Sequence, residues 1–467
     1  MLKSISCCSA ALILALASVS LAVPVESVRP NIILIFVDDM GYGDPGCYGG
    51  ALVKTPNIDA LADGGIRFTQ GYSISPVCGP SRVGLLTGMQ PSRIGVYWNP
   101  DMGAVRLPQG HALLPEALKA AGYRTGIVGK WNLSNPSWDP MPVLRYFDQA
   151  YDTMVWEGDY WPDASGNYHG VEDGKYGSSK TNAIWGPIHD GDEYLTDRLT
   201  RHACAFIAQD AEEEPFFLYL AYNAPHSPLQ GRADHLPRLS AIESEAQRLY
   251  ASMVLAVDEG VGQVVRELER QKIMKNTLVL FISDNGPAVT SFKGLPEHWP
   301  RDEMLGSTGG LNGKKGTYFE GGIRVPFILH WPAQVEDAFV YDSPVTTLDL
   351  FPTLCAIAGT KPSAKTRLDG VNLVPFLLPN QSTLPDRTLL WFSGPSGAVR
   401  RGDWKLLFDQ DSAPQLYNLE QDPKETMDLA EDESVVVKEL SAVVREWRQQ
   451  VPPPVTPREN LKKKASP

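Results

Sequence analysis

The stretch from Ile32 to Asp39, IILIFVDD, joins an apolar run to two adjacent carboxylates. Three later stretches have the same form: Tyr123 to Val128 meets Gly129-Lys130, Phe216 to Tyr222 meets Asn223-Ala224-Pro225-His226, and Leu278 to Ile282 meets Ser283-Asp284-Asn285-Gly286. Continuous apolar runs of this length are typical of strands buried on both faces of a parallel sheet. Because ligands of open α/β sheets bind beyond the carboxyl ends of the strands, we expect the four polar clusters to share one edge.

Helical patterns separate these runs. Apolar residues recur every three or four positions from Leu249 to Leu268, and the segments 55–65 and 113–122 have a proline near the start and a glycine at the end. The alternation predicts an α/β class: a doubly wound, mostly parallel sheet flanked by helices. After about Asp386, short strand-like runs between Gly, Asp and Pro predict a small C-terminal antiparallel sheet, followed by a helix near residues 434–449.

The first residues have the pattern of an export signal. One lysine precedes the apolar run from Ala10 to Leu16, and small residues follow up to Ala22. Ser18 and Ser20 interrupt the run, so we expect a cleaved signal peptide rather than a stable membrane anchor, and a secreted or periplasmic protein. We predict a signal peptide over 1–22, a main α/β domain over 23–385, a C-terminal subdomain over 386–452 and a disordered Pro- and Lys-rich tail over 453–467.

Composition excludes several classes of protein. The net charge of −13 argues against a nucleic-acid partner, although an anionic substrate could still bind in a locally cationic pocket. Of the six cysteines, two leave with the signal, and no C-x-x-C pair occurs among Cys47, Cys78, Cys204 and Cys355. The chain is therefore neither a disulfide scaffold nor a zinc ribbon.

The two acidic clusters suggest a metal site. Asp38-Asp39 and Asp284-Asn285 each follow an expected strand, and adjacent carboxylates repel one another unless a cation or hydrogen bonds offset their charge. Oxygen ligands favour a hard divalent ion, Ca²⁺ or Mg²⁺. The alternative, that each pair caps a helix or turn, stays open at this point.

Five other residues are ambiguous when taken singly. Lys130 after a strand has the pattern of a solvated charge, and His226 that of a loop histidine. Lys314 and Lys315 lie in a Gly-rich segment that lacks the P-loop pattern, and Cys78 alone suggests a small buried hydrophobe.

Together these residues match a known family. The run Cys78-Gly79-Pro80-Ser81-Arg82, with Leu85 and Thr87-Gly88 behind it, resembles the C-x-P-S-R signature of type I sulfatases, the formylglycine-dependent members of the alkaline phosphatase superfamily. RPNIILIFVDDMGYGD, TPNIDALADGGIRF, YRTGIVGKW, APHSP, VLFISDNG, NGKKGTYFEGGIRVP and AVRRGDWKLLF resemble that family's segments in the same order. The resemblance covers essentially the whole chain after the expected signal.

The resemblance implies a mechanism. A formylglycine-generating enzyme would oxidise Cys78 to Cα-formylglycine (3-oxoalanine), whose hydrate is the nucleophile. One Ca²⁺ ion would be held by Asp38, Asp39, Asp284, Asn285 and the modified Cys78. Arg82, Lys130 and Lys315 would offset the charge of the sulfate, and His226 would protonate or polarise the leaving oxygen.

One position departs from the family pattern. The family has G-K-W-H-L-G where this chain has Gly129-Lys130-Trp131-Asn132-Leu133-Ser134, so an amide replaces a histidine that takes a proton. Asn cannot act as a base near neutral pH. Three interpretations stay open: another group such as His169 or His189 substitutes, turnover is slow, or Asn132 only orients the hydrate.

We therefore expect a sulfuric ester hydrolase that acts on a sulfated carbohydrate. The many aromatic residues between Trp138 and Trp185 suit the stacking of sugar rings, although they suit a packed core equally well. Two alternatives are a phosphonate or phosphate monoester hydrolase of the same superfamily and a degenerate sulfatase that binds sulfated glycans without turnover. The sequence leaves open the sugar, the position of the sulfate, endo or exo action and the oligomeric state.

Overall fold

The computed structural model describes residues 29–99, 101, 107–133, 143–154, 159–162, 193–209, 214–291, 295–377 and 384–455. The expected signal peptide, most of the aromatic-rich segment, His169, His189 and residues 456–467 lie outside this part of the chain. Within the described residues, no helix is both long and apolar enough to cross a membrane.

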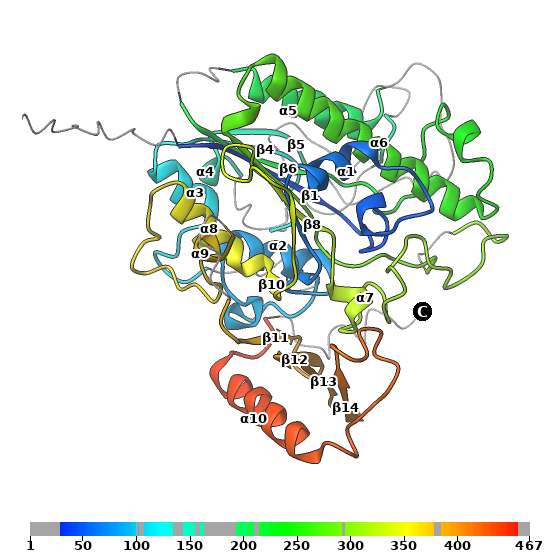
Figure 1. The fold of residues 1–467 in the computed structure, drawn as a ribbon, viewed down its shortest axis with the longest axis vertical. Helices are drawn as coiled ribbons and strands as arrows, with labels where there is room; N and C mark the ends of the chain where they lie inside the picture. Colours follow the sequence, from blue (N-terminus) through cyan, green and yellow to red (C-terminus); the bar gives the residue numbers. More distant parts are fainter. Residues whose placement is uncertain are drawn as a thin grey trace, which may run out of the picture.

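The predicted mostly parallel sheet is confirmed (Figure 1). Its described strands lie in the order β5 (Gln149–Met154), β4 (Arg124–Lys130), β6 (Phe216–Ala221), β1 (Asn31–Val37), β7 (Thr277–Ser283), β8 (Phe327–His330), β2 (Ile66–Phe68) and β9 (Phe339–Tyr341). Strand β8 is antiparallel to both neighbours, and the other pairs are parallel. The four apolar runs thus form the four adjacent strands β4, β6, β1 and β7, whose carboxyl ends meet at one edge.

Helices cover both faces of this sheet (Figure 1). Ile33, Ile35 and Val37 of β1 belong to a core with α1 (Pro56–Asp63), α5 (Leu195–Ile207) and α6 (Glu245–Arg270). Ile32, Leu34 and Phe36 belong to a second core with α2 (Cys78–Thr87), α3 (Leu114–Ala120) and α8 (Leu350–Ile357). Alternate side chains of a strand point to opposite faces, which explains why β1 is apolar at every position from Ile32 to Val37.

Local signals set the ends of these helices. The apolar periodicity from Leu249 to Leu268 forms α6, and the Ser244 side chain caps its first turn by accepting from Gln247 N at 3.3 Å. Helix α1 starts at Pro56 and ends before Gly64. The shorter elements of the main domain are α4 (Val143–Tyr146), α7 (Glu320–Ile323), α9 (Val374–Leu377), β3 (Gly71–Tyr72) and β10 (Val345–Thr346).

A second, antiparallel sheet follows, as predicted. It consists of β11 (Thr388–Phe392), β12 (Gly397–Arg401), β13 (Trp404–Asp409) and β14 (Ser412–Asn418). Helix α10 (Ser434–Gln450) packs on one face through Leu440 and Val444. The other face packs against the main domain, where Trp391 Nε1 donates to Ser73 O at 2.8 Å. The C-terminal sheet therefore contacts the segment that leads to Cys78.

Candidate active site

The polar clusters that follow the central strands converge at one edge of the main sheet. Asp38 and Asp39 follow β1, Lys130 ends β4, and Asp284 follows β7. Asp39 N donates to Asp284 Oδ1 at 3.2 Å, which joins the ends of β1 and β7 directly. His226 follows β6, and its Nε2 lies 3.7 Å from Asp39 Oδ2.

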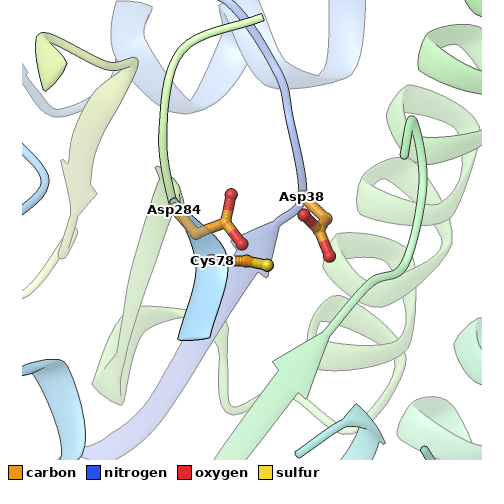
Figure 2. Close-up of side chains that lie close together, drawn as sticks. All are labelled: Asp38, Cys78 and Asp284. Carbon is orange, nitrogen blue, oxygen red and sulfur yellow. The ribbon is translucent and has the colours of Figure 1, made fainter. Parts of the chain in front are cut away.

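Cys78 lies at the centre of this edge. It is the first residue of α2, is 3% exposed, and points toward Asp38 and Asp284 (Figure 2). One potential ligand atom from each of these three residues lies within 4.8 Å of the other two. The helix N-terminus also directs its partial positive charge to this place, which favours a bound anion.

Three cations surround the carboxylates. Arg82 Nη2 lies 2.9 Å from Asp284 Oδ2 and 3.4 Å from Asp38 Oδ2. Lys130 Nζ pairs with Asp38 Oδ2, and Lys315 Nζ lies 2.7 Å from Asp39 Oδ1. Lys314, the neighbour of Lys315, faces away and lies 3.9 Å from Asp302. Of these two adjacent lysines, Lys315 therefore contributes its charge to the site and Lys314 does not.

Burial and charge set opposite protonation states for the two carboxyls that face Cys78. Burial raises the pKa of Asp284 to about 8, the charge of Asp38 adds to this, and Arg82 opposes it. Burial would also raise the pKa of Asp38, but Lys130, His226 and Arg82 hold it well below its usual range. A carboxyl that keeps its proton near neutral pH can exchange that proton for a further cation.

Two side-chain oxygens indicate where that cation would bind. Asp38 Oδ1 and Asn285 Oδ1 are buried and have no hydrogen-bond partner among the described residues. Asn285 Nδ2 donates to Asp39 Oδ1 at 2.7 Å, which keeps the amide oxygen free for another partner. Carboxylate and amide oxygens are the donors that Ca²⁺ and Mg²⁺ prefer, so these residues fit a hard divalent ion.

The ring of His226 is held in one orientation. Its Nδ1 lies 2.6 Å from the carbonyl oxygen of Ser227, so Nδ1 carries a hydrogen and Nε2 faces Asp39. Burial and the charge of Lys315 lower the pKa of His226, while Asp39 and Asp38 oppose this shift. These contacts and the lowered pKa favour the neutral ring, with its hydrogen on Nδ1.

The Cys78 thiol is poorly suited to act as a thiolate. Burial raises its pKa, and Lys130 and Lys315 only partly offset that effect. Asn99, which the sequence did not single out, donates from Nδ2 to Cys78 Sγ at 3.4 Å and accepts from Gly79 N at 3.0 Å. No local pattern marks Asn99, because its contact with Cys78 crosses 21 positions of the chain.

Comparison with known proteins decides the family. Residues 30–360 match the family model described as Sulfatase, which is most of the chain. The chain belongs to the sulfatase family. Residues 310–450 match a second model, described as N-sulphoglucosamine sulphohydrolase, C-terminal.

Named relatives agree with this assignment. The sulfatase is 35% identical to N-acetylgalactosamine-6-sulfatase of Homo sapiens over 377 residues, which cover 78% of this chain and 68% of the relative. It is 32% identical to arylsulfatase A of Homo sapiens over 450 residues, covering 86% of this chain and 83% of the relative. The crystal structure of Ps i-CgsB in complex with k-i-k-neocarrahexaose superposes with a TM-score of 0.79 at 32% identity, covering 93% and 96% of the two chains. The predicted resemblance to sulfatases is confirmed, and the chain is an enzyme of this class.

Asn132 of this sulfatase lies at the same edge, two residues after Lys130. Its side chain is fully buried, so the sequon Asn132-Leu133-Ser134 does not expose its amide to glycosylation. Its φ of 54° lies in the left-handed region, where Asn and His are enriched among non-glycine residues. The backbone at this position thus suits the histidine of the family pattern as well as the amide found here.

A cavity of about 220 Å³ is lined by two residues that neighbour groups of the site along the chain. Its lining includes Trp98, which precedes Asn99, and Gly316, which follows Lys315. The side chains of Tyr318, Phe319 and Phe408 also line it, the last from the C-terminal sheet. This half-exposed aromatic surface therefore begins one position along the chain from Asn99 and from Lys315.

Proposed function

We propose that this sulfatase hydrolyses the sulfate ester of a carbohydrate, with Cys78 oxidised to formylglycine as its nucleophile. The observation that carries the proposal is the position of Cys78 at the start of α2, facing Asp38 and Asp284 and enclosed by Arg82, Lys130 and Lys315. A buried thiol with a raised pKa has no evident use there, whereas a hydrated aldehyde would have one.

The cations and the helix N-terminus would bind the sulfate group. Lys130 and Lys315 carry their charge on flexible stems that can contact sulfate oxygens, and Arg82 fixes the carboxylates between them. Fixed positive groups at the place where charge develops in the transition state supply the largest part of such catalysis.

The first chemical step would be attack of one hydrate hydroxyl on sulfur. The oxygen–sulfur bond to the hydrate forms, the bond between sulfur and the substrate's ester oxygen breaks, and the hydroxyl proton is lost to solvent water. His226, in its protonated form, would donate from Nε2 to the leaving alcohol oxygen.

The second step would release sulfate. The remaining hydroxyl loses its proton to solvent water, because the amide of Asn132 cannot accept it, the carbonyl reforms, and the carbon–oxygen bond to sulfate breaks. Water then adds to the aldehyde and restores the hydrate. A serine in the place of formylglycine has no second hydroxyl and would stop at the sulfated intermediate.

A divalent ion, which we propose to be Ca²⁺, would be held by Asp38, Asp39, Asp284, Asn285 and the modified Cys78. When bound, this ion would supply charge that offsets the sulfate oxygens and lowers the pKa of the attacking hydroxyl. The unpartnered oxygens of Asp38 and Asn285 support this ligand set.

A sulfated carbohydrate is the substrate class that the relatives and the site favour. The relatives include N-acetylgalactosamine-6-sulfatase, and the Ps i-CgsB structure contains k-i-k-neocarrahexaose. The aromatic cavity beside Lys315 suits a sugar ring adjoining the sulfated one, because sugar faces pack on aromatic rings. We further propose that a formylglycine-generating enzyme matures the chain and that the mature enzyme is secreted or periplasmic, in line with the signal pattern over residues 1–22.

Mass spectrometry of the Cys78 peptide tests the proposal together with two matched substrates. Formylglycine at residue 78, and faster turnover of 4-nitrophenyl sulfate than of 4-nitrophenyl phosphate, are the expected results. A preference for the phosphate ester would identify a phosphomonoester hydrolase instead. Unmodified Cys78 with binding of sulfated glycans and no turnover would identify a degenerate sulfatase.

A further inference from the structure

A fully buried lysine of the C-terminal sheet lies in the centre of an ionic cluster outside the site. Lys405 of β13 is 0% exposed, and its Nζ lies 2.8 Å from Glu320 Oε1 of α7 and 2.8 Å from Glu425 Oε1. Glu425 Oε2 accepts from the backbone N–H of Glu320 at 2.6 Å. The cluster therefore holds both the side chain and the backbone of Glu320.

The same cluster reaches the segment that leads to Cys78. Tyr72 donates its hydroxyl to Glu320 Oε2 at 2.7 Å, and Arg400 Nη1 donates to that hydroxyl at 2.5 Å. Arg400 of β12 lies directly opposite Lys405 in the antiparallel ladder. The C-terminal sheet thus presents two neighbouring cations to the main domain, one to Glu320 and one to Tyr72, which lies six positions before Cys78.

We define the Gly-rich loop as residues 306–319. Glu320, the first residue of α7, follows it directly. This loop carries Lys315, and its backbone touches both sides of the site: Lys315 N donates to Pro287 O and Gly316 N donates to Pro76 O, each at 2.9 Å. Its far end is closed by Gly321 N, which donates to Asn312 O at 2.6 Å, while Asn312 Nδ2 donates to Glu425 O at 3.3 Å. The position of Lys315 therefore depends on where Glu320 and Glu425 are held.

Stability alone does not account for a buried lysine at this place. Taking an ammonium and two carboxylates out of water costs much of what their attraction returns, and well-packed apolar side chains are often as stable. What a buried ion pair enforces is one arrangement of its partners. The charges of Lys405, Arg324 and Arg400 outweigh the effect of burial and lower the pKa of Glu320 to about 2, so Glu320 keeps its charge for this arrangement.

We propose that Lys405 is a positioning residue: by pairing with Glu320 and Glu425 it fixes the Gly-rich loop so that Lys315 meets Asp39 beside Cys78. The C-terminal sheet would therefore affect the catalytic rate without contacting the sulfate. This inference rests on the proposed function for the role of Lys315, but not for the contacts themselves.

The test compares the full chain with Lys405→Met and with Lys405→Met/Glu425→Gln. The single variant leaves two carboxylates facing each other without a cation, so the loop should shift. A misplacement of about 1 Å costs about 10²-fold in rate, and we expect a loss of this order in kcat for 4-nitrophenyl sulfate. In the double variant the new carboxamide at position 425 can donate a hydrogen bond to Glu320. We therefore expect the double variant to regain at least half of the loss in log kcat.

Hydrogen exchange provides a readout that does not need turnover. In Lys405→Met the amides of Lys315, Gly316 and Gly321 should exchange faster, while those of β1 and β7 should not change. Asp258→Ala is the control, because it removes a buried carboxylate that accepts from Asn57 N and Ile58 N on the opposite face of the sheet. It should lower the melting temperature and leave kcat and loop exchange unchanged.

The outcomes separate the two proposals. If the parent protein shows no sulfate-ester turnover, the proposed function fails, and exchange in the loop still decides the role of Lys405. Should Lys405→Met keep kcat within about twofold of the parent and leave loop exchange unchanged, the positioning role is overturned. A loss of activity in Lys405→Met that only follows the unfolded fraction of the protein overturns it as well. If Lys405→Met does not fold, Glu425→Gln replaces it, with faster loop exchange expected and unchanged exchange contradicting the proposal.

Discussion

Lys315 Nζ lies 2.7 Å from Asp39 Oδ1, although 276 positions separate the two residues. The side chain of Lys314 next to it is 38% exposed and points to Asp302, while that of Lys315 is 18% exposed and points into the site. Two adjacent lysines with opposite directions form a matched pair for testing which charge the reaction uses.

Replacing Lys315 with Met should lower kcat/KM for 4-nitrophenyl sulfate by about 10²-fold to 10³-fold, because one fixed positive group that stabilises the transition state is lost. Lys314→Met changes the same chemistry one position away and should stay within about twofold of the parent. Steady-state kinetics on both variants checks this. Equal losses in the two variants would remove Lys315 from the site.

Cys78→Ala should abolish turnover and keep the fold, because the side chain is small and belongs to none of the four hydrophobic core clusters of the described residues. Circular dichroism and the melting temperature would report the fold, and sulfate release would report turnover. Cys78→Ser offers a hydroxyl but no aldehyde, so at most a single turnover is expected from it. Normal activity in either variant would refute the formylglycine mechanism.

Asp284→Ala should lose both the metal and the activity. The carboxylates of Asp38 and Asp39 would remain in the site with one ligand fewer. Elemental analysis should find less than one calcium per chain, and chelation of the parent protein should reproduce the loss until Ca²⁺ is returned. Unchanged calcium content in Asp284→Ala would show that the ion binds elsewhere.

Asn132 should slow the release of sulfate. General base catalysis is typically worth about 10²-fold to 10⁴-fold, so without the histidine of the family pattern the sulfated intermediate should break down more slowly than it forms. Rapid mixing should then show a burst of alcohol followed by a slower steady state. In Asn132→His, whose backbone conformation tolerates histidine, the steady rate should rise and the burst should shrink. A parent protein without a burst, and a slower Asn132→His, would indicate that the base comes from another residue.

Asp258 should make stability fall as the pH rises. Burial raises its pKa from 3.8 to about 6, against the opposing hydrogen bonds from Ile58 and Asn57. The folded protein therefore holds this proton more tightly than the unfolded chain does, and that stabilisation is complete below pH 4 and lost by about pH 6. Over this window the free energy of unfolding should fall by up to about 3 kcal/mol more in the parent than in Asp258→Asn. Denaturant unfolding at several pH values would measure the difference, and parallel curves would contradict it.

The sequence predicted the architecture and most of the site because both follow from local patterns. Apolar runs that end in polar residues predict parallel strands, and parallel strands place their carboxyl ends at one edge whatever lies between them. Asp38, Lys130, His226 and Asp284 therefore had to converge once the sheet formed. Cys78 joined them through the resemblance of its flanking residues to the sulfatase signature. The predicted domain limits and the roles of the individual site residues stay predictions.

Tertiary structure alone decided the contacts that have no local pattern. The residue pattern did not distinguish Lys314 from Lys315, which only the resemblance to sulfatases singled out, and nothing in the sequence marked Asn99 or Lys405. The direction of a side chain within the Gly-rich loop depends on packing between segments that are far apart in the chain. So does the ion pair between Lys405 of β13 and Glu320 of α7, which are separated by 85 positions. Periodicity and spacing describe only residues that are neighbours along the chain. Whether a charged side chain is buried depends on which distant segments pack around it in the folded protein.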